Sequence, residues 1–115
     1  MKTTIRGKQA ETAVAEQLAR DGYEVIGQNW KTKVCEIDVI AKREEIIYFT
    51  EVKYRGEQAQ GNGLAYITPQ KLHKLHFAAS VWTQFNNWGG DYRLLAASVT
   101  TDGVNYIIEE IIELE

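Results

Sequence analysis

Residues 35–55, CEIDVIAKREEIIYFTEVKYR, place charged side chains inside two strongly apolar runs. Strand alternation puts Glu36 and Asp38 on one face of the first run, and it puts Glu51 and Lys53 on one face of the second. If the two runs pair as a hairpin, both sets meet on the same side of one sheet. Converging half-buried carboxylates repel one another and lose hydration, which destabilises a fold by several kcal/mol unless something compensates.

A hard divalent cation would compensate. Mg²⁺ prefers oxygen ligands, keeps several waters, and typically binds one or two protein carboxylates together with substrate phosphate. A lysine two residues after Glu51 can hold the attacking water and neutralise charge on the phosphorus oxygens. The pattern therefore makes Asp38, Glu51 and Lys53 candidate residues for phosphodiester hydrolysis. An ordinary cross-strand ion-pair set at Glu51 and Lys53, with Glu36 as a solvated edge residue, explains the same pattern without catalysis.

Apolar spacing and turn residues predict the elements that would position these side chains. Helices are expected over 7–21 and about 69–85, the second beginning with the cap pair Thr68-Pro69. Strands are expected over 23–30, 34–41, 45–53, 92–99 and 104–114, with hairpin turns at KREE and TTDG and a loop marked by Gly56, Gly61 and Gly63. The order α-β-β-β-α-β-β predicts an α/β fold with a mixed sheet, in a single domain over residues 1–115.

The first predicted helix carries one acidic residue on its inner side. Its apolar face is formed by Ala10, Ala13, Val14 and Leu18. Winding the helix at 3.6 residues per turn places Glu11 within this apolar arc. Glu11 is therefore expected to face the sheet and to join the other carboxylates.

The distribution of charge bears on the partner. The net charge of −3 argues mildly against nucleic acid, but four acidic residues lie in the C-terminal EEIIELE, and the rest of the chain holds 13 basic and 12 acidic residues. Local fields rather than total charge steer a phosphate chain. Basic residues occur in pairs along the sequence, at Arg6/Lys8, Lys31/Lys33, Lys53/Arg55 and Lys71/Lys74. Arg55, Lys71 and Lys74 are thus candidates to bind nucleic acid, although solvated surface lysines explain any single pair equally well.

The cellular compartment is predicted from what the sequence lacks. The one cysteine, Cys35, excludes an internal disulfide, and the N-terminus has no apolar core of the kind a signal peptide needs. No apolar run approaches the roughly 20 residues of a membrane span. We expect a cytoplasmic protein without a membrane partner, and the sequence leaves a homodimer open. His73 and His76 with the distant thiol are too few ligands for an ordinary zinc site.

Five ordered segments also resemble a known family. GKQAE with Ala15, GYEVIGQN, EIDVIA, EVKYR and ITPQKLHKL look like the YraN family, small bacterial proteins assigned as endonucleases, and they cover about Gly7 to Val99. That family belongs to the PD-(D/E)xK superfamily, which has the restriction-endonuclease-like fold, and is similar to archaeal Holliday-junction resolvases. Cys35 stands where the family usually has glycine, which leaves the ligands intact.

The resemblance implies roles for individual residues. Asp38, Glu51 and Lys53 match the catalytic motif, and Glu11 joins Asp38 and Glu51 as a further metal-site carboxylate. Gln70 and Lys71 match the start of the helix that borders the cleft in such folds, so both are expected to contact nucleic acid.

Taken together, these features predict a metal-dependent nuclease that acts on DNA, branched or single-stranded, with Mg²⁺ or Mn²⁺ as cofactor. Two alternatives stay open, a non-catalytic nucleic-acid-binding module of the same fold and an RNA-directed nuclease. Intact Asp38, Glu51 and Lys53 favour catalysis over a non-catalytic module. No feature of the sequence indicates recognition of the 2′-hydroxyl of RNA, so the sequence does not decide between DNA and RNA.

Overall fold

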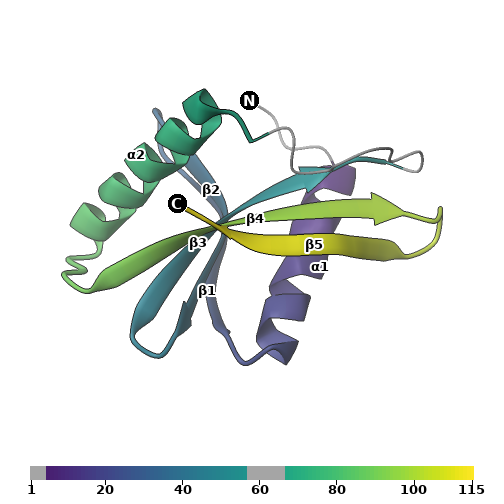
Figure 1. Ribbon diagram of the computed structural model, residues 1–115, viewed down its shortest axis with the longest axis horizontal. Coiled ribbons are helices and arrows are strands. Elements are labelled where there is room, and N and C mark those ends of the chain that lie inside the picture. Colours follow the sequence, from purple (N-terminus) through teal and green to yellow (C-terminus); the bar gives the residue numbers. More distant parts are fainter. Residues whose placement is uncertain (1–4, 57–66) are drawn as a thin grey trace.

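In the described ranges, 5–56 and 67–115, five strands form one sheet and two helices cover its opposite faces (Figure 1). The structure is a computed structural model that describes residues 5–56 and 67–115, so the predicted loop residues Gly61 and Gly63 lie outside it. The elements in chain order are α1 (Ile5–Arg20), β1 (Glu24–Lys31), β2 (Glu36–Arg43), β3 (Ile46–Tyr54), α2 (Pro69–Phe85), β4 (Asp91–Thr101) and β5 (Tyr106–Leu114). The predicted order and the mixed α/β fold are confirmed, and the arrangement is compatible with a restriction-endonuclease-like fold.

The strands lie side by side in chain order, from β1 to β5. Neighbouring strands are antiparallel except β3 and β4, which are parallel and are connected through α2. A parallel pair needs such a crossover, because a tight turn can only reverse the chain. The central strand is therefore β3, which carries Glu51 and Lys53.

Each face of the sheet has its own apolar cluster. The α1-side cluster joins Val14 and Leu18 to inward residues of the sheet such as Val39, Tyr48 and Ala97. The α2-side cluster joins helix residues to the opposite face of the sheet, and its members are Ile37, Ile40, Ile47, Phe49, Leu75, Ala78, Ala79 and Leu94. The sheet is thus the middle of three layers, and β2 and β3 each contact both helices.

Local signals explain where α2 begins, and coverage on both faces explains why most of β4 is buried. Thr68 accepts a hydrogen bond on its side-chain oxygen from the Lys71 N–H at 3.2 Å, and Pro69 is the first helical residue, so the helix has the predicted limits. Residues 94–99 of β4 are all buried, as expected for a strand covered on both faces. β4 extends beyond the predicted 92–99 at both ends.

Neither helix in the described ranges is long and apolar enough to span a membrane.

The hairpin that joins β2 and β3 turns through two glutamates. Glu44 and Glu45 have φ angles of 52° and 62°, and they lie between the paired residues Arg43 and Ile46. A two-residue hairpin loop with two positive φ angles matches the twist of the strands, but it is usually made by Asn-Gly or Asp-Gly. The predicted KREE turn is confirmed, with side chains that suit this backbone poorly.

We predict that Glu45→Gly stabilises the protein, because glycine adopts a positive φ without the Cβ clash of an L-residue. The free energy of unfolding, measured by urea denaturation, should rise by about 1 kcal/mol. The matched control Glu110→Gly, in the extended backbone of β5, should lower it. A lower stability for Glu45→Gly would contradict the turn geometry.

Candidate active site

β2 and β3 separate at one end of their hairpin. The two strands are paired from the turn as far as Val39 and Thr50. Beyond this last pair, β2 extends back to Glu36 and β3 continues to Tyr54 without being paired to each other. Just beyond the last pair, the Val52 N–H donates a hydrogen bond of 2.7 Å to Oδ2 of Asp38. The Asp38 carboxylate thus satisfies a backbone donor that a continuing strand pair would satisfy with a carbonyl oxygen.

Side-chain alternation is lost around Asp38. Ile37 and Ile40 both pack in the α2-side cluster, although an odd spacing along a strand normally points side chains to opposite faces. The alternation on which the predicted shared face of Glu36 and Asp38 depends is therefore interrupted at Asp38. Glu36 and Glu51 both line a pocket beneath α2, and the charges of both act on Asp38, which also hydrogen-bonds to Glu11 of α1. The ladder to β3 has ended at this point, and on the other side of β2 the residue opposite Asp38, Asn29, has a φ of 53° and is missing from the paired register.

Glu11 faces the sheet, as its helical phase predicts. Its residue is 6% exposed, which is unusual for a glutamate. Burial raises the pKa of Glu11, while the hydrogen bond with Asp38 acts in the opposite direction. The α1 helix therefore brings one carboxylate down onto the gap between β2 and β3.

Asp38 is the most strongly perturbed acid of the site. Burial, the largest cause, and the charges of Glu11, Glu51 and Glu36 together raise its pKa from 3.8 to about 8, against the effect of the hydrogen bond from Val52. The three other carboxylates are therefore close enough to Asp38 to act on its charge. At neutral pH Asp38 keeps its proton, and this proton relieves the repulsion among the neighbouring carboxylates.

Glu51 lies on the central strand among positive charges. Burial raises its pKa, while the charges of Lys71 and Lys53 lower it and that of Glu36 raises it. Its Oε2 atom is buried and has no hydrogen-bond partner among residues 5–56 and 67–115. An acceptor left without a partner in a buried place is costly, so this oxygen is suited to an incoming cation or donor.

The acidic residues do not form a complete metal cage by themselves. Within the part of the chain that the structure describes, no three His, Cys, Asp or Glu side chains are grouped closely enough to hold a metal ion. The arrangement is instead a pair, Asp38 and Glu51, with Glu11 hydrogen-bonded to Asp38. Such a pair can bind an ion that takes its remaining ligands from water and substrate.

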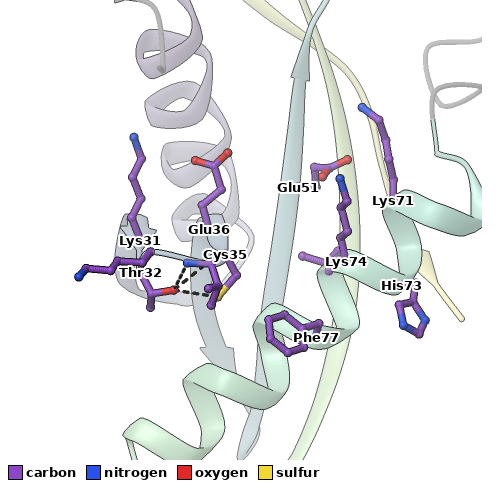
Figure 2. A pocket seen from close by; sticks show the side chains of 12 residues that line it. Lys31, Thr32, Cys35, Glu36, Glu51, Lys71, His73, Lys74 and Phe77 are labelled. Atoms are coloured by element: carbon purple, nitrogen blue, oxygen red, sulfur yellow. Dashed lines mark hydrogen bonds between the residues drawn. The ribbon is translucent and has the colours of Figure 1, made fainter. Parts of the chain in front are cut away.

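A pocket of 640 Å³ opens beside Glu51 (Figure 2). One wall is the segment from Lys31 to Glu36, which connects β1 to β2, and the other is the first half of α2. Lys71 and Lys74 project from α2 on the Glu51 side. Gln70 and Arg55 are not among the described residues that line the pocket.

Comparison with known proteins adds the family. The model of the uncharacterised protein family UPF0102 matches residues 10–102. The chain belongs to the UPF0102 family. UPF0102 is the YraN family, so the resemblance carried by the ordered segments is confirmed.

Individual relatives match over much of their length. A UPF0102 protein of Vibrio campbellii is 35% identical over 112 residues, which cover 93% of this chain and 92% of the relative. One from a Sulfurihydrogenibium species is 36% identical over 94 residues, 81% of this chain and 82% of its own. One from Vibrio vulnificus is 41% identical over 76 residues, 66% of this chain and 62% of its own.

In this UPF0102 chain, Arg55 is held by a neighbour that the sequence did not suggest. Its Nη1 atom lies 3.3 Å from Oε1 of Glu109, and the Ser98 hydroxyl donates to the same oxygen at 2.6 Å. The register of β4 and β5 shifts between Ser98 and Val99, which leaves Glu109 as an extra residue of β5. A bulge of this kind re-aims a side chain, here toward the end of β3.

The sequence analysis also did not assign several other residues to the site. Lys31 and Lys33 are visible in the sequence as a basic pair, but nothing local indicates that they line a pocket together with residues of α2. Phe77 follows Lys74 by three residues, a spacing that places the two on one stripe of a helix. The sequence contains no signal for the bulge at Glu109.

The pKa of Asp38 predicts how the stability of the metal-free protein depends on pH. The unfolded chain releases the Asp38 proton near pH 3.8 and the folded chain near pH 8, so the folded state binds the extra proton in between. Stability should therefore fall as pH rises through this window. Asp38→Asn removes this contribution, so at pH 8 in EDTA the variant should be more stable than the parent by more than about 1 kcal/mol.

Urea denaturation at pH 5 and pH 8 checks this prediction. The variant should gain more at pH 8 than at pH 5, while the control Asp91→Asn, at an exposed position, should change stability by less than about 0.5 kcal/mol at either pH. A metal-free Asp38→Asn protein that unfolds more easily than the parent at pH 8 would show that the carboxylate has a purely structural role.

Proposed function

We propose that this protein is a metal-dependent nuclease that hydrolyses phosphodiester bonds in DNA. The observation that carries the proposal is the buried Oε2 atom of Glu51, which lacks a partner among the described residues. The charge of Glu51 acts on Asp38, which lies where the pairing of β2 and β3 ends. A purely structural ion pair would satisfy both oxygens of a buried carboxylate. Membership of the YraN family supports the same chemistry through the PD-(D/E)xK motif.

The donor set fits Mg²⁺ or Mn²⁺. Carboxylate oxygens are hard ligands, and a site with two of them leaves room for the waters and substrate phosphate that Mg²⁺ keeps. Asp38 and Glu51 would hold the ion, and Glu11 would complete the acidic set through its hydrogen bond with Asp38. A bound ion of this kind supplies an activated water and polarises a phosphoryl oxygen.

The basic residues around this pair take the remaining roles. Lys53 lies two residues after Glu51 on β3, is exposed, and lowers the pKa of Glu51 by its charge. In the proposed reaction it orients the attacking water and neutralises charge that develops on the phosphorus oxygens. Lys71 and Lys74 bind the adjoining phosphates, and Arg55 and Gln70 contact the strand beyond them.

Cleavage of a substrate panel tests the proposed activity. Labelled branched, flapped and single-stranded DNAs and an RNA of the same sequence are incubated with Mg²⁺, Mn²⁺ or EDTA. At least one DNA should be cut with metal and none in EDTA, and Glu51→Gln prepared in parallel should be inactive, which excludes a contaminating nuclease. Binding of nucleic acid without cleavage would indicate the non-catalytic module, and cleavage of RNA alone would overturn the assignment to DNA.

We further predict that Lys53→Ala separates catalysis from metal binding. Cleavage should fall by about 100- to 1,000-fold, because one preorganised electrostatic contact is lost from the transition state. Metal affinity, followed as the rise in melting temperature with Mg²⁺, should stay constant or increase, since a positive charge has left the site. The control Lys42→Ala removes a lysine from β2 that is paired with Glu45.

The control should cleave like the parent. Normal cleavage by Lys53→Ala, or loss of its response to Mg²⁺, would contradict the role assigned to Lys53.

A further inference from the structure

The pocket beside Glu51 is larger than the binding of a single phosphate requires. Its volume of 640 Å³ lies within the range of sites that enclose one small ligand. Bases in a duplex are stacked inside the helix, so a base can enter such a pocket only when it is unpaired. The size therefore favours a nucleotide outside a duplex as occupant.

Positive charge is concentrated on both walls. Lys31 is the last residue of β1 and Lys33 lies in the turn to β2, whereas Lys71 and Lys74 belong to α2. Four lysines thus surround a pocket that holds two carboxylates, in a protein whose net charge is −3. A chain of phosphates that crosses the pocket meets cations on either side, which matches the charged groove of single-strand binders.

An aromatic side chain completes the pocket. Phe77 is 48% exposed, lines the pocket, and lies on the side of α2 that faces the turn with Thr32 and Cys35 (Figure 2). It follows Lys71 and Lys74 at intervals of three, so the three side chains form one stripe on the helix. An inorganic anion would need only the lysines, whereas a nucleotide offers phosphate to the lysines and a base to the ring.

We propose that this pocket binds one unpaired nucleotide of a single strand, with its base against Phe77 and its flanking phosphates between Lys31 and Lys33 on one wall and Lys71 and Lys74 on the other. This inference deepens the proposed function and rests on it for the identity of the ligand as nucleic acid. It names the substrate class of the same site, a single strand or the unpaired part of a branched DNA.

Binding in EDTA tests the inference without any need for cleavage. Fluorescence anisotropy is measured with a labelled 12-nucleotide oligo-dT and with the same strand paired to oligo-dA. The single strand should bind at least 10-fold more tightly than the duplex. Equal or tighter binding of the duplex would overturn the inference.

Variants locate the bound strand. Phe77→Ala should weaken binding of oligo-dT by about 5-fold or more, because base–aromatic stacking contributes substantially for each base. The matched control Phe85→Ala removes an aromatic ring of the same helix that is 73% exposed and lies outside the lining, and it should bind within 2-fold of the parent. If Phe77→Ala does not fold, Phe77→Leu keeps the apolar bulk without the ring and should also weaken binding.

The salt dependence of binding tests whether Lys31 and Lys33 contact phosphates. The double variant Lys31→Ala/Lys33→Ala should lower the slope of log affinity against log salt by about 1.4, which corresponds to two phosphate contacts with a single strand. An unchanged slope, or unchanged affinity in both Phe77 variants, would overturn the placement. Single-strand binding without any nuclease activity would reject only the proposed function, whereas metal-dependent cleavage without a preference for single strands would reject only this inference.

Discussion

The hydrogen bond from the Val52 amide to the Asp38 carboxylate is the interaction on which the rest of the site depends. If β2 and β3 continued their ladder beyond Val39 and Thr50, this amide would meet a backbone carbonyl and Asp38 would point to one face of the sheet. Because the ladder ends, the carboxylate enters the gap between the strands. There it is reached by Glu11 from the α1 layer and lies within the electrostatic influence of Glu51 on the central strand. One interruption of the sheet therefore assembles acidic groups from three elements.

This assembly is destabilising in the absence of a cation, and the fold tolerates it in two ways. The raised pKa of Asp38, about 8, favours its protonated form at neutral pH, and the charges of Lys53 and Lys71 act on Glu51, so the repulsion among the four carboxylates is reduced there. Burial of the apolar clusters on both faces of the sheet stabilises the fold and offsets the repulsion among the carboxylates. Functional sites commonly depart from the most stable arrangement in this manner, and binding of a cation and a phosphate would relieve the strain.

Much of the fold could be predicted because its signals are local. The limits of α2 follow from a cap at Thr68, and the burial of Glu11 follows from helical phase alone. What could not be predicted depends on segments far apart in the chain. Alternation along a strand cannot show where its ladder ends, so the sequence does not reveal that the alternation of side chains is interrupted at Asp38. The bulge that directs Glu109 toward β3 and the approach of the Lys31–Glu36 segment to α2 arise only when the elements pack together.

Paramagnetic broadening by Mn²⁺ in the NMR spectrum of the ¹⁵N-labelled protein tests the central claim most directly, because it locates a cation without requiring cleavage. The account predicts that substoichiometric Mn²⁺ broadens the amide signals of Asp38 and Val52 first, and that Asp38→Asn abolishes this selective effect. Broadening centred instead on the acidic strand with Glu109, Glu110 and Glu113, or spread evenly over the surface, would contradict a cation site at the separation of β2 and β3.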